Sequence, residues 1–218
     1  YVLDDPAVYR PCVSMHSNDD VTSLAWSNFD GVLATGTFSG LIVLYKEKSE
    51  VHRLSHTAPI VSLHFAPESS LLASVSTDGH IIVSENGEIK GTWDVEPPVS
   101  DIRFLNTNSA YVSSNNSVFL ITLTEKSPVK VAEMKGEIIQ IALSPKSHCL
   151  AIGDNKGNFT VINHKQKVVC NHDHLHDSSI CSISPAVNSD SFATGGCDGF
   201  VKLVNIEQKN EDVVFDGH

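Results

Sequence analysis

Short apolar segments alternate with polar turns along the whole chain. Segments such as LIVLY (41–45) and VFLITL (118–123) are rich in β-branched and aromatic residues, and clusters of Gly, Asn, Asp and Ser separate them. Few windows place apolar residues at the i, i+3, i+4, i+7 spacing of an amphipathic helix. The pattern therefore predicts an all-β protein.

The β pattern recurs with a fixed period. Five passages resemble one another, and their first residues lie 39, 39, 39 and 42 positions apart: LATGTFSGLIVLY (33–45), LASVSTDGHIIVS (72–84), YVSSNNSVFLIT (111–122), LAIGDNKGNFTVI (150–162) and FATGGCDGFVKLV (192–204). Twelve residues before each passage another apolar segment begins, at Val21, Ile60, Val99, Ile138 and Ile180. Such regularity indicates five structural repeats.

Each repeat is interpreted as four strands, a to d. Asp-Gly or Ser-Gly at three of the b–c corners suits a tight turn, because glycine adopts positive φ without steric cost. Apolar residues alternate along strand c, and several strands are apolar on both faces, which is typical of a sheet packed between two others. Four-stranded units of roughly 40–45 residues predict a WD40-type β-propeller. A β-sandwich, the alternative, would not repeat at a fixed period.

The repeats cover the chain as a single domain, residues 1–218. Their approximate limits are 14–50, 51–90, 91–128, 129–167 and 168–209, with the start of a sixth repeat at 210–218. Residues 212–215 are expected to complete the fifth sheet, whereas Val8–Val13 resembles an outer strand without a sheet to join. Because exposed sheet edges are avoided, we expect the five repeats to be part of a seven- or eight-bladed ring. Five blades closing on themselves are the alternative.

The repeats are degenerate. In well-formed WD40 repeats, a His before strand a, a Ser or Thr in strand b, the corner Asp and a Trp in strand c form a hydrogen-bonded chain. No repeat keeps that Trp here, and only the second and fifth keep both His and Asp. We predict the pairs His56–Asp78 and His176–Asp198, with no such network in the other blades. The fifth blade is then expected to depend on packing of Val201 and Leu203.

Charge and cysteine content narrow the function. The net charge is −11 with 15 Lys and Arg, which argues against nucleic-acid binding and favours basic partners such as histone tails. No apolar run approaches the length of a membrane-spanning helix. The five cysteines form no C-x-x-C motif, so we expect free thiols in the reducing nucleus or cytoplasm.

One segment could carry chemistry. In NHDHLHD (171–177), His172, His174 and His176 occupy alternate positions and could share a Zn²⁺ ion. However, His176 is assigned to Asp198, and polar residues are ordinary on a d–a connection. No nucleophile, phosphate-binding or dinucleotide motif occurs. We therefore expect neither a metal, a cofactor nor a catalytic site.

Function on a propeller resides in its loops. The d–a and b–c loops gather on one face, where we expect contacts with protein or peptide partners. The candidate contact residues are Phe38, His56, Thr57, Trp93, Pro97 and Pro98. Burial between neighbouring blades is the alternative for each of them.

Three segments carry a narrower resemblance. DDVTSLAWSNFDGVLATGTFSG (19–40), SHTAPIVSLHFAP (55–67) and FLITLTEKSPVKV (119–131) resemble transducin-beta-like subunits of histone deacetylase corepressor complexes, the fungal members included. The likeness covers roughly residues 20–165. It implies a nuclear scaffold that docks deacetylase subunits, with histone tails as further partners. Those proteins carry an N-terminal oligomerisation region and better-kept Trp-Asp pairs, neither of which is visible here.

Two alternatives remain. The chain could be a WD40 scaffold of another assembly, such as a ubiquitin-ligase adaptor or an RNA-processing or trafficking subunit, and could then be cytoplasmic. A metal-binding or hydrolytic propeller based on the histidine cluster is the weaker alternative.

Overall fold

The computed structural model describes residues 17–206 and 213–216. This part of the chain is built from β-strands that form five four-stranded antiparallel sheets. None of the described residues belongs to a helix long and apolar enough to cross a membrane. The predicted all-β class is confirmed.

The strands follow one another regularly along the chain. The first sheet contains β1 (Val21–Trp26), β2 (Val32–Thr37), β3 (Leu41–Lys46) and β4 (Ser49–Ser55). The second contains β5 (Ile60–Phe65), β6 (Leu71–Ser76), β7 (His80–Glu85) and β8 (Glu88–Asp94). The third contains β9 (Val99–Asn106), β10 (Ser109–Ser114), β11 (Ser117–Thr122) and β12 (Val129–Glu133). The fourth contains β13 (Ile138–Leu143), β14 (Leu150–Asp154), β15 (Phe159–Ile162) and β16 (Val168–His172). The fifth contains β17 (Ile180–Pro185), β18 (Ser191–Gly196), β19 (Phe200–Asn205) and β20 (Val213–Asp216).

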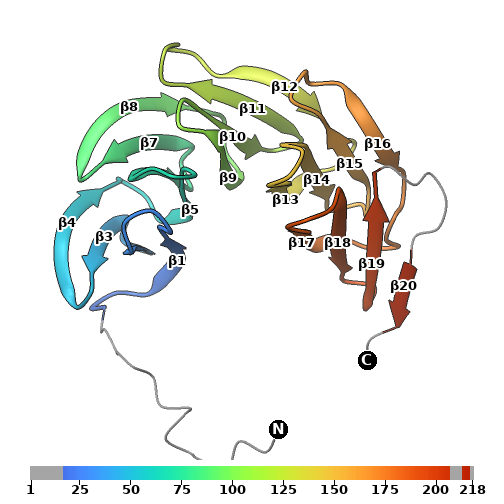
Figure 1. Ribbon diagram of the computed structural model, residues 1–218, viewed down its shortest axis with the longest axis horizontal. Helices are drawn as coiled ribbons and strands as arrows, with labels where there is room; N and C mark the ends of the chain where they lie inside the picture. Colours follow the sequence, from blue (N-terminus) through green and yellow to red (C-terminus); the bar gives the residue numbers. More distant parts are fainter. Residues whose placement is uncertain (1–16, 207–212, 217–218) are drawn as a thin grey trace, which may run out of the picture.

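The five sheets stand side by side around an arc (Figure 1). Strands β1, β5, β9, β13 and β17 line its inner side, and β4, β8, β12 and β16 its outer side. This is the arrangement of propeller blades, so the sandwich alternative is wrong. The first and last sheets stand apart, and the five blades therefore do not close on themselves (Figure 1). The number of blades in a complete ring stays a prediction.

The strand order agrees with the repeat pattern. All five inner strands begin at the residues where the upstream apolar segments begin, and β20 pairs with β19 as expected for residues 212–215. β4 and β8 straddle the predicted repeat limits, because each sheet takes its outer strand from the start of the next repeat. The segment Val8–Val13 and most of the sixth repeat lie outside the described residues.

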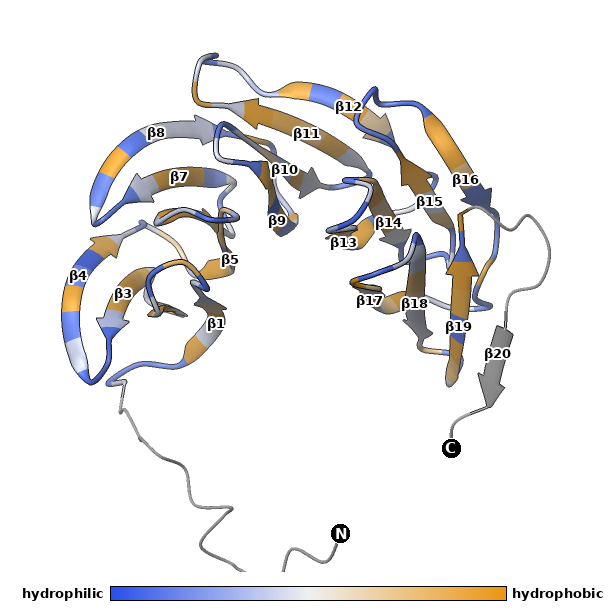
Figure 2. Cartoon of the chain, viewed as in Figure 1, coloured by the Kyte–Doolittle hydropathy of each residue, from blue (hydrophilic) through white to orange (hydrophobic). Residues whose placement is uncertain are grey.

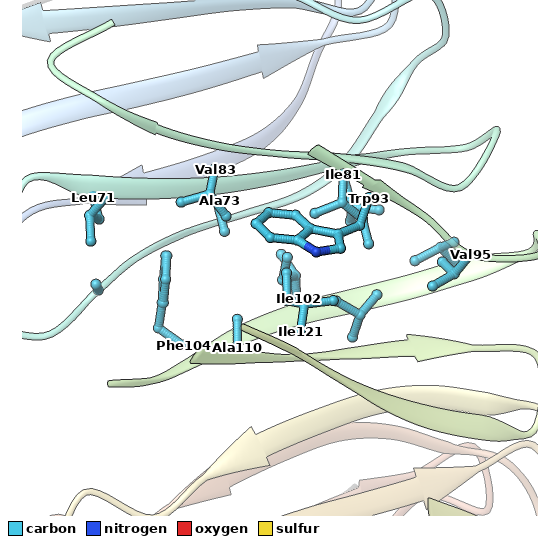
Figure 3. Packing of buried hydrophobic residues seen from close by; sticks show 14 residues of the cluster. Leu71, Ala73, Ile81, Val83, Trp93, Val95, Ile102, Phe104, Ala110 and Ile121 are labelled. Atoms are coloured by element: carbon cyan, nitrogen blue, oxygen red, sulfur yellow. The ribbon is translucent and has the colours of Figure 1, made fainter. Parts of the chain in front are cut away.

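Apolar side chains fill the space between successive sheets. Hydrophobic residues concentrate on the middle strands, such as β3, β7, β11 and β15 (Figure 2). One cluster joins the second and third sheets around Trp93, which is 5% exposed and packs with Ile81, Ile102 and Phe104 (Figure 3). Burying a side chain of this kind contributes about 1.5–3 kcal/mol, so sheet-to-sheet packing dominates the stability.

The outward faces of the two end sheets remain uncovered among the described residues. Leu24 of β1 is 62% exposed, whereas Leu63 at the same position of β5 is 3% exposed. In the fifth sheet Val201 and Leu203 are 41% and 37% exposed. No described sheet lies against this face, so the expectation that this blade depends on their packing stays a prediction.

One pair of cysteines forms a disulfide, although free thiols were expected. Cys181 of β17 and Cys197, directly after β18, form a disulfide with their Cα atoms 6.4 Å apart. The two strands are antiparallel neighbours, which brings these residues together although 16 positions separate them. The prediction of free thiols is wrong for this pair. Cys149 and Cys170 remain thiols, and Cys12 lies outside the described residues.

Four of the five described b–c corners have glycine at positive φ: Gly40, Gly79, Gly157 and Gly199. Gly79 has φ +86°, and a Cβ added there would lie 1.9 Å from the carbonyl oxygen of Val95. Gly199 has nearly the same φ, +85°, but a Cβ there would meet nothing within 4 Å. An alanine at Gly199 would therefore add backbone strain alone, whereas an alanine at Gly79 would add the same strain and a steric clash.

We predict that Gly199→Ala lowers the free energy of unfolding by roughly 1–2 kcal/mol, the cost of a left-handed non-glycine residue. Gly79→Ala should cost at least about twice as much, because the methyl group also displaces the second d–a connection. Urea unfolding of both variants measures the difference. Equal losses would contradict the prediction, since Val95 would then move aside without cost.

Candidate functional site

The b–c corners and d–a connections lie at one end of the sheets and form the surface that we call the loop face. A backbone bond ties corner to connection in every described blade. The donors and acceptors are Phe38 N to Asp20 O, Thr77 N to Pro59 O, Asn115 N to Pro98 O, Asn155 N to Glu137 O, and Cys197 N to Ser179 O, all at 2.8–2.9 Å. The loop face is thus held by the backbone in all five blades, whatever its side chains are.

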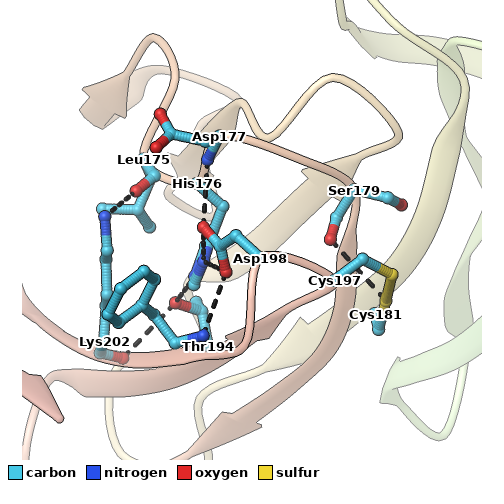
Figure 4. Close-up of polar contacts among 10 residues, drawn as sticks. Leu175, His176, Asp177, Ser179, Cys181, Thr194, Cys197, Asp198 and Lys202 are labelled. Atoms are coloured by element: carbon cyan, nitrogen blue, oxygen red, sulfur yellow. Dashed lines mark hydrogen bonds and ion pairs between the residues drawn. A yellow bond between two sulfur atoms is a disulfide. The ribbon is translucent and has the colours of Figure 1, made fainter. Parts of the chain in front are cut away.

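In the fifth blade, a histidine–aspartate pair reinforces this tie. His176 is buried, and its Nδ1 lies 2.9 Å from Asp198 Oδ1, as predicted (Figure 4). Its Nε2 lies 2.9 Å from Thr194 Oγ1, and the Asp177 amide donates to Asp198 Oδ2. Burial alone would raise the pKa of Asp198, but the bonds from His176 and the backbone amides lower it. The pair anchors the corner of this blade.

In the second blade a serine separates the predicted partners. Ser76 Oγ donates to Asp78 Oδ1 at 2.5 Å and lies 2.9 Å from His56 Nδ1. Because the Ser76 proton points to Asp78, its oxygen accepts from His56 Nδ1–H. The prediction of a direct His56–Asp78 bond is therefore wrong. Ser76 of the second blade lies between the two side chains, whereas the fifth blade has Gly196 at this position, which has no side chain to intervene. The hydrogen bond from Ser76 is the main cause that lowers the pKa of Asp78.

The other three blades replace the histidine with other groups. In the first, Asp19 Oδ2 accepts from Ser39 N at 2.7 Å, and the bonds from Ser39 lower the pKa of Asp19 to about 2. In the third, Asn115 Nδ2 donates to Pro97 O. In the fourth, the buried Asp154 accepts from Gly136 N. These blades lack the His–Asp pair, as expected, but each has a polar tie of its own.

The candidate contact residues divide into exposed and buried ones. Phe38 is 62% exposed at its corner, and Thr57 is exposed while donating to Asp78 Oδ2 at 2.9 Å. Pro97 and Pro98 are exposed and joined by a cis peptide bond.

His56 and Trp93 are buried, so their assignment to the contact surface is wrong. Trp93 belongs to β8, not to the d–a connection, and its side chain lies between two sheets with Nε1 donating to Glu125 O. His56 is enclosed because both of its ring nitrogens face serines of β6.

The loop face is acidic. Asp20, Asp78, Glu96 and Glu137 are exposed on it. Three described lysines reach this face: Lys135 Nζ lies 2.6 Å from Asp173 Oδ2, Lys156 Nζ donates to the Lys135 carbonyl, and Lys202 Nζ donates to the Leu175 carbonyl. The loop face therefore presents negative charge that its own cations do not neutralise.

The histidine cluster does not converge. His172 ends β16 with its ring near Phe159, so the segment is not wholly a loop. His176 uses both ring nitrogens on Asp198 and Thr194, which leaves neither available to a metal. The described residues contain no group of three or more His, Cys, Asp and Glu side chains arranged to hold a metal ion.

A groove at the opposite end of the sheets was not predicted. Two adjoining hollows of about 730 and 630 Å³ share His64, Pro67, Glu68 and Arg103. The residues lining them include Trp26, Phe29, Phe104, Leu143, Ile183 and Pro185. The residues that line the two hollows lie within or directly after strand a of five different blades, and the curvature of the arc brings them together. We call this the central groove.

His64 stands between the two hollows of the central groove. Its Nδ1 accepts from Phe104 N at 3.2 Å, and burial, with a further contribution from Arg103, lowers its pKa to about 4. Arg103 Nη1 lies 2.7 Å from the buried Asp101. The groove thus contains polar groups, among them an arginine paired with an aspartate.

The sequence matches a known repeat family. The family described as "WD domain, G-beta repeat" matches residues 10–46, 48–83 and 165–205, which together make up just over half of the chain. These segments contain most of the strands of the first, second and fifth sheets. The third and fourth repeats, which lack a corner aspartate, are not matched.

Two curated proteins are similar over part of their length. The WD repeat-containing protein 55 homolog of Aedes aegypti is 27% identical over 162 residues, 69% of this chain and 35% of that protein. The F-box-like/WD repeat-containing protein TBL1X of Mus musculus is 28% identical over 134 residues, 56% of this chain and 25% of that protein. The chain thus spans about a third or less of these relatives.

A solved structure shares the fold. The crystal structure of the computationally designed Ika8 protein superposes with a TM-score of 0.77 at 16% identity. The match covers 91% of this chain and 62% of that one. At this identity the likeness supports the arrangement of the sheets alone.

Two histidines, the buried His56 and the half-buried His64, predict a pH dependence of stability. Burial lowers the pKa of His56 and of His64 from 6.5 to about 4, so the unfolded chain binds these protons first as the pH falls. The free energy of unfolding that the two neutral histidines contribute is fully present above about pH 6.5 and is lost progressively as the pH falls toward 4. For His64, a shift of this size corresponds to at most roughly 3 kcal/mol.

Urea unfolding at pH 7, 6 and 5 measures this loss. His56→Gln and His64→Gln should each lose less stability over this range than the wild type. His164→Gln, at an exposed position in the turn before β16, is the control and should follow the wild type. A His56→Gln/His64→Gln variant as pH-dependent as the wild type would refute the assignment.

Proposed function

Because the chain belongs to the WD40-repeat family, we propose that it is a non-catalytic scaffold for protein–protein interaction. The family match carries this proposal. WD40 domains generally bind proteins, and five sheets packed in series give a rigid frame whose loops present contact residues. The backbone ties of the loop face keep that surface in place before a partner arrives, which reduces the entropy cost of binding.

We propose further that the scaffold belongs to a chromatin corepressor assembly containing a histone deacetylase, and that it acts in the nucleus. The resemblance of residues 19–40 and 55–67 to transducin-beta-like subunits supports this, as does the similarity to the mouse TBL1X protein. The similarity to the repeat protein 55 homolog favours the alternative of another WD40 assembly to a comparable degree.

The charge of the loop face favours a basic partner. Exposed carboxylates at its corners and connections accelerate association with a Lys- or Arg-rich peptide, and salt screens this attraction. Phe38, whose amide donates to the carbonyl of Asp20, offers an exposed aromatic anchor on this face. Deacetylase subunits and histone tails are the partners that we propose for this face.

Affinity purification of the full-length protein from nuclear extract tests the assembly. We expect a histone deacetylase and its corepressor subunits among the captured proteins. Recovery of ligase, ribosomal or coat subunits without a deacetylase would reject the corepressor proposal and keep the scaffold. Absence of any stoichiometric partner would reject both.

Substitution of two phenylalanines of the first blade distinguishes the loop face from the central groove as the binding surface. Phe38 on the loop face and Phe29 in the central groove are each 62% exposed, so Phe38→Ala and Phe29→Ala remove equal groups at opposite ends. We predict that Phe38→Ala weakens partner capture about tenfold or more, as for a typical aromatic anchor, whereas Phe29→Ala leaves it unchanged.

Quantitative pull-down at two salt concentrations provides the measurement. Binding through the acidic loop face should also weaken as the salt concentration rises. Loss of binding with Phe29→Ala alone would move the site to the central groove.

A further inference from the structure

The two cysteines of the Cys181–Cys197 disulfide occupy positions that can be compared across all five repeats. Cys181 is the second residue of strand a, where the other blades have Thr22, Val61, Ser100 and Ile139. Cys197 is the residue before the b–c corner position, where they have Phe38, Thr77, Asn115 and Asn155. Only the fifth blade combines two cysteines at these positions, so the fold does not require the bond.

Both cysteines are accessible. Cys181 and Cys197 are exposed, whereas Cys149 is buried and Cys170 is half-buried. Their Cα atoms are 6.4 Å apart, within the range that a disulfide bridges without moving the backbone. The backbone bond from Cys197 N to Ser179 O fixes this separation independently of the sulfur atoms. The two thiols therefore stay together whether or not they are bonded.

The pair lies beside the polar anchor of the fifth blade. Cys197 directly precedes Asp198, which holds His176 and the Asp177 amide (Figure 4). A covalent link from Cys197 to the inner strand adds to the backbone tie at the same corner. The redox state of the pair thus bears on the rigidity of one corner of the loop face.

We propose that Cys181 and Cys197 form a reversible thiol–disulfide site that reacts with small disulfides of the glutathione class. One cysteine, as the thiolate, attacks a sulfur of the small disulfide, forms a mixed disulfide and releases one small thiol. The second cysteine then attacks the protein-side sulfur and releases the other small thiol. Two protein thiols are oxidised by two electrons, and the small disulfide becomes two thiols that take up both protons.

This chemistry fits the nuclear location that we propose above, and its link to a reducing compartment rests on that proposal. In such compartments disulfides are rare, and those that occur are usually transient or redox-sensing. Exposed thiols held at bonding distance meet the requirements for exchange, because both sulfurs are open to attack. The proposal does not depend on which partner the loop face binds.

Redox titration of the purified protein tests the proposal. The protein is equilibrated in buffers from 100-fold excess of oxidised glutathione to 100-fold excess of reduced glutathione, alkylated and mapped by mass spectrometry. We expect a linked Cys181–Cys197 peptide at the oxidising end and two separately alkylated cysteines at the reducing end. The unfolding midpoint should be higher by roughly 5–10 °C in the oxidised form, since the bond closes a loop between residues 16 positions apart.

Two variants serve as controls. A Cys12→Ser/Cys149→Ala/Cys170→Ser variant keeps only the pair and should titrate like the wild type. Cys197→Ser should lose both the linked peptide and the redox dependence of the midpoint. Because peptide mapping of the wild type needs no variant, the test stands even if a variant fails to fold.

Three results would overturn the proposal. Separate alkylation of both cysteines at the oxidising end would show that no bond forms, and a stable glutathione adduct would show that the second step fails. A bond that persists at the reducing end would show a permanent structural disulfide.

Discussion

The packing of each sheet against the next is the interaction on which the rest of this structure depends. Leu63, Ile102 and Ile141 occupy one position of strand a in three successive blades, and all are buried because a neighbouring sheet covers them. Leu24, at the same position of the first blade, is exposed. Since every inner blade buries both faces, its middle strands are largely apolar on both sides, and this packing joins the sheets into the arc. The decayed Trp-Asp signature is tolerated for this reason.

Polar side chains adjust this packing at defined places. Along the inner edge, Ser62 Oγ donates to Asp101 of the next blade, and Gln140 Oε1 accepts from Ile183 N of the next. On the loop face, the histidine pair of the fifth blade and the carboxylate of Asp154 perform the same task with different atoms. The backbone bonds between corner and connection are present in every described blade, and each blade adds polar side-chain bonds of its own. Degeneracy of sequence therefore does not loosen the face.

The two ends of the sheets offer surfaces of different chemistry. The loop face carries exposed carboxylates and the exposed Phe38, whereas the central groove is lined by apolar side chains together with His64, Glu68 and the paired Arg103. A rigid frame with two such surfaces suits a scaffold that contacts more than one protein. The cysteine pair lies at the loop face and connects its fifth corner to the inner strand, so the redox site and the partner surface that we propose would involve neighbouring residues.

The amino-acid pattern by itself determined the five repeats, the first residue of every inner strand, the glycine corners and the pair His176–Asp198. These features follow from local chemistry repeated at a fixed period, which needs no knowledge of distant contacts. Only the tertiary structure decided that Trp93 and His56 are buried, that Ser76 separates His56 from Asp78, that Cys181 meets Cys197, and that five blades contribute to one groove. Each of these depends on the direction of a side chain across strands or between sheets, and a one-dimensional period carries no information about that direction.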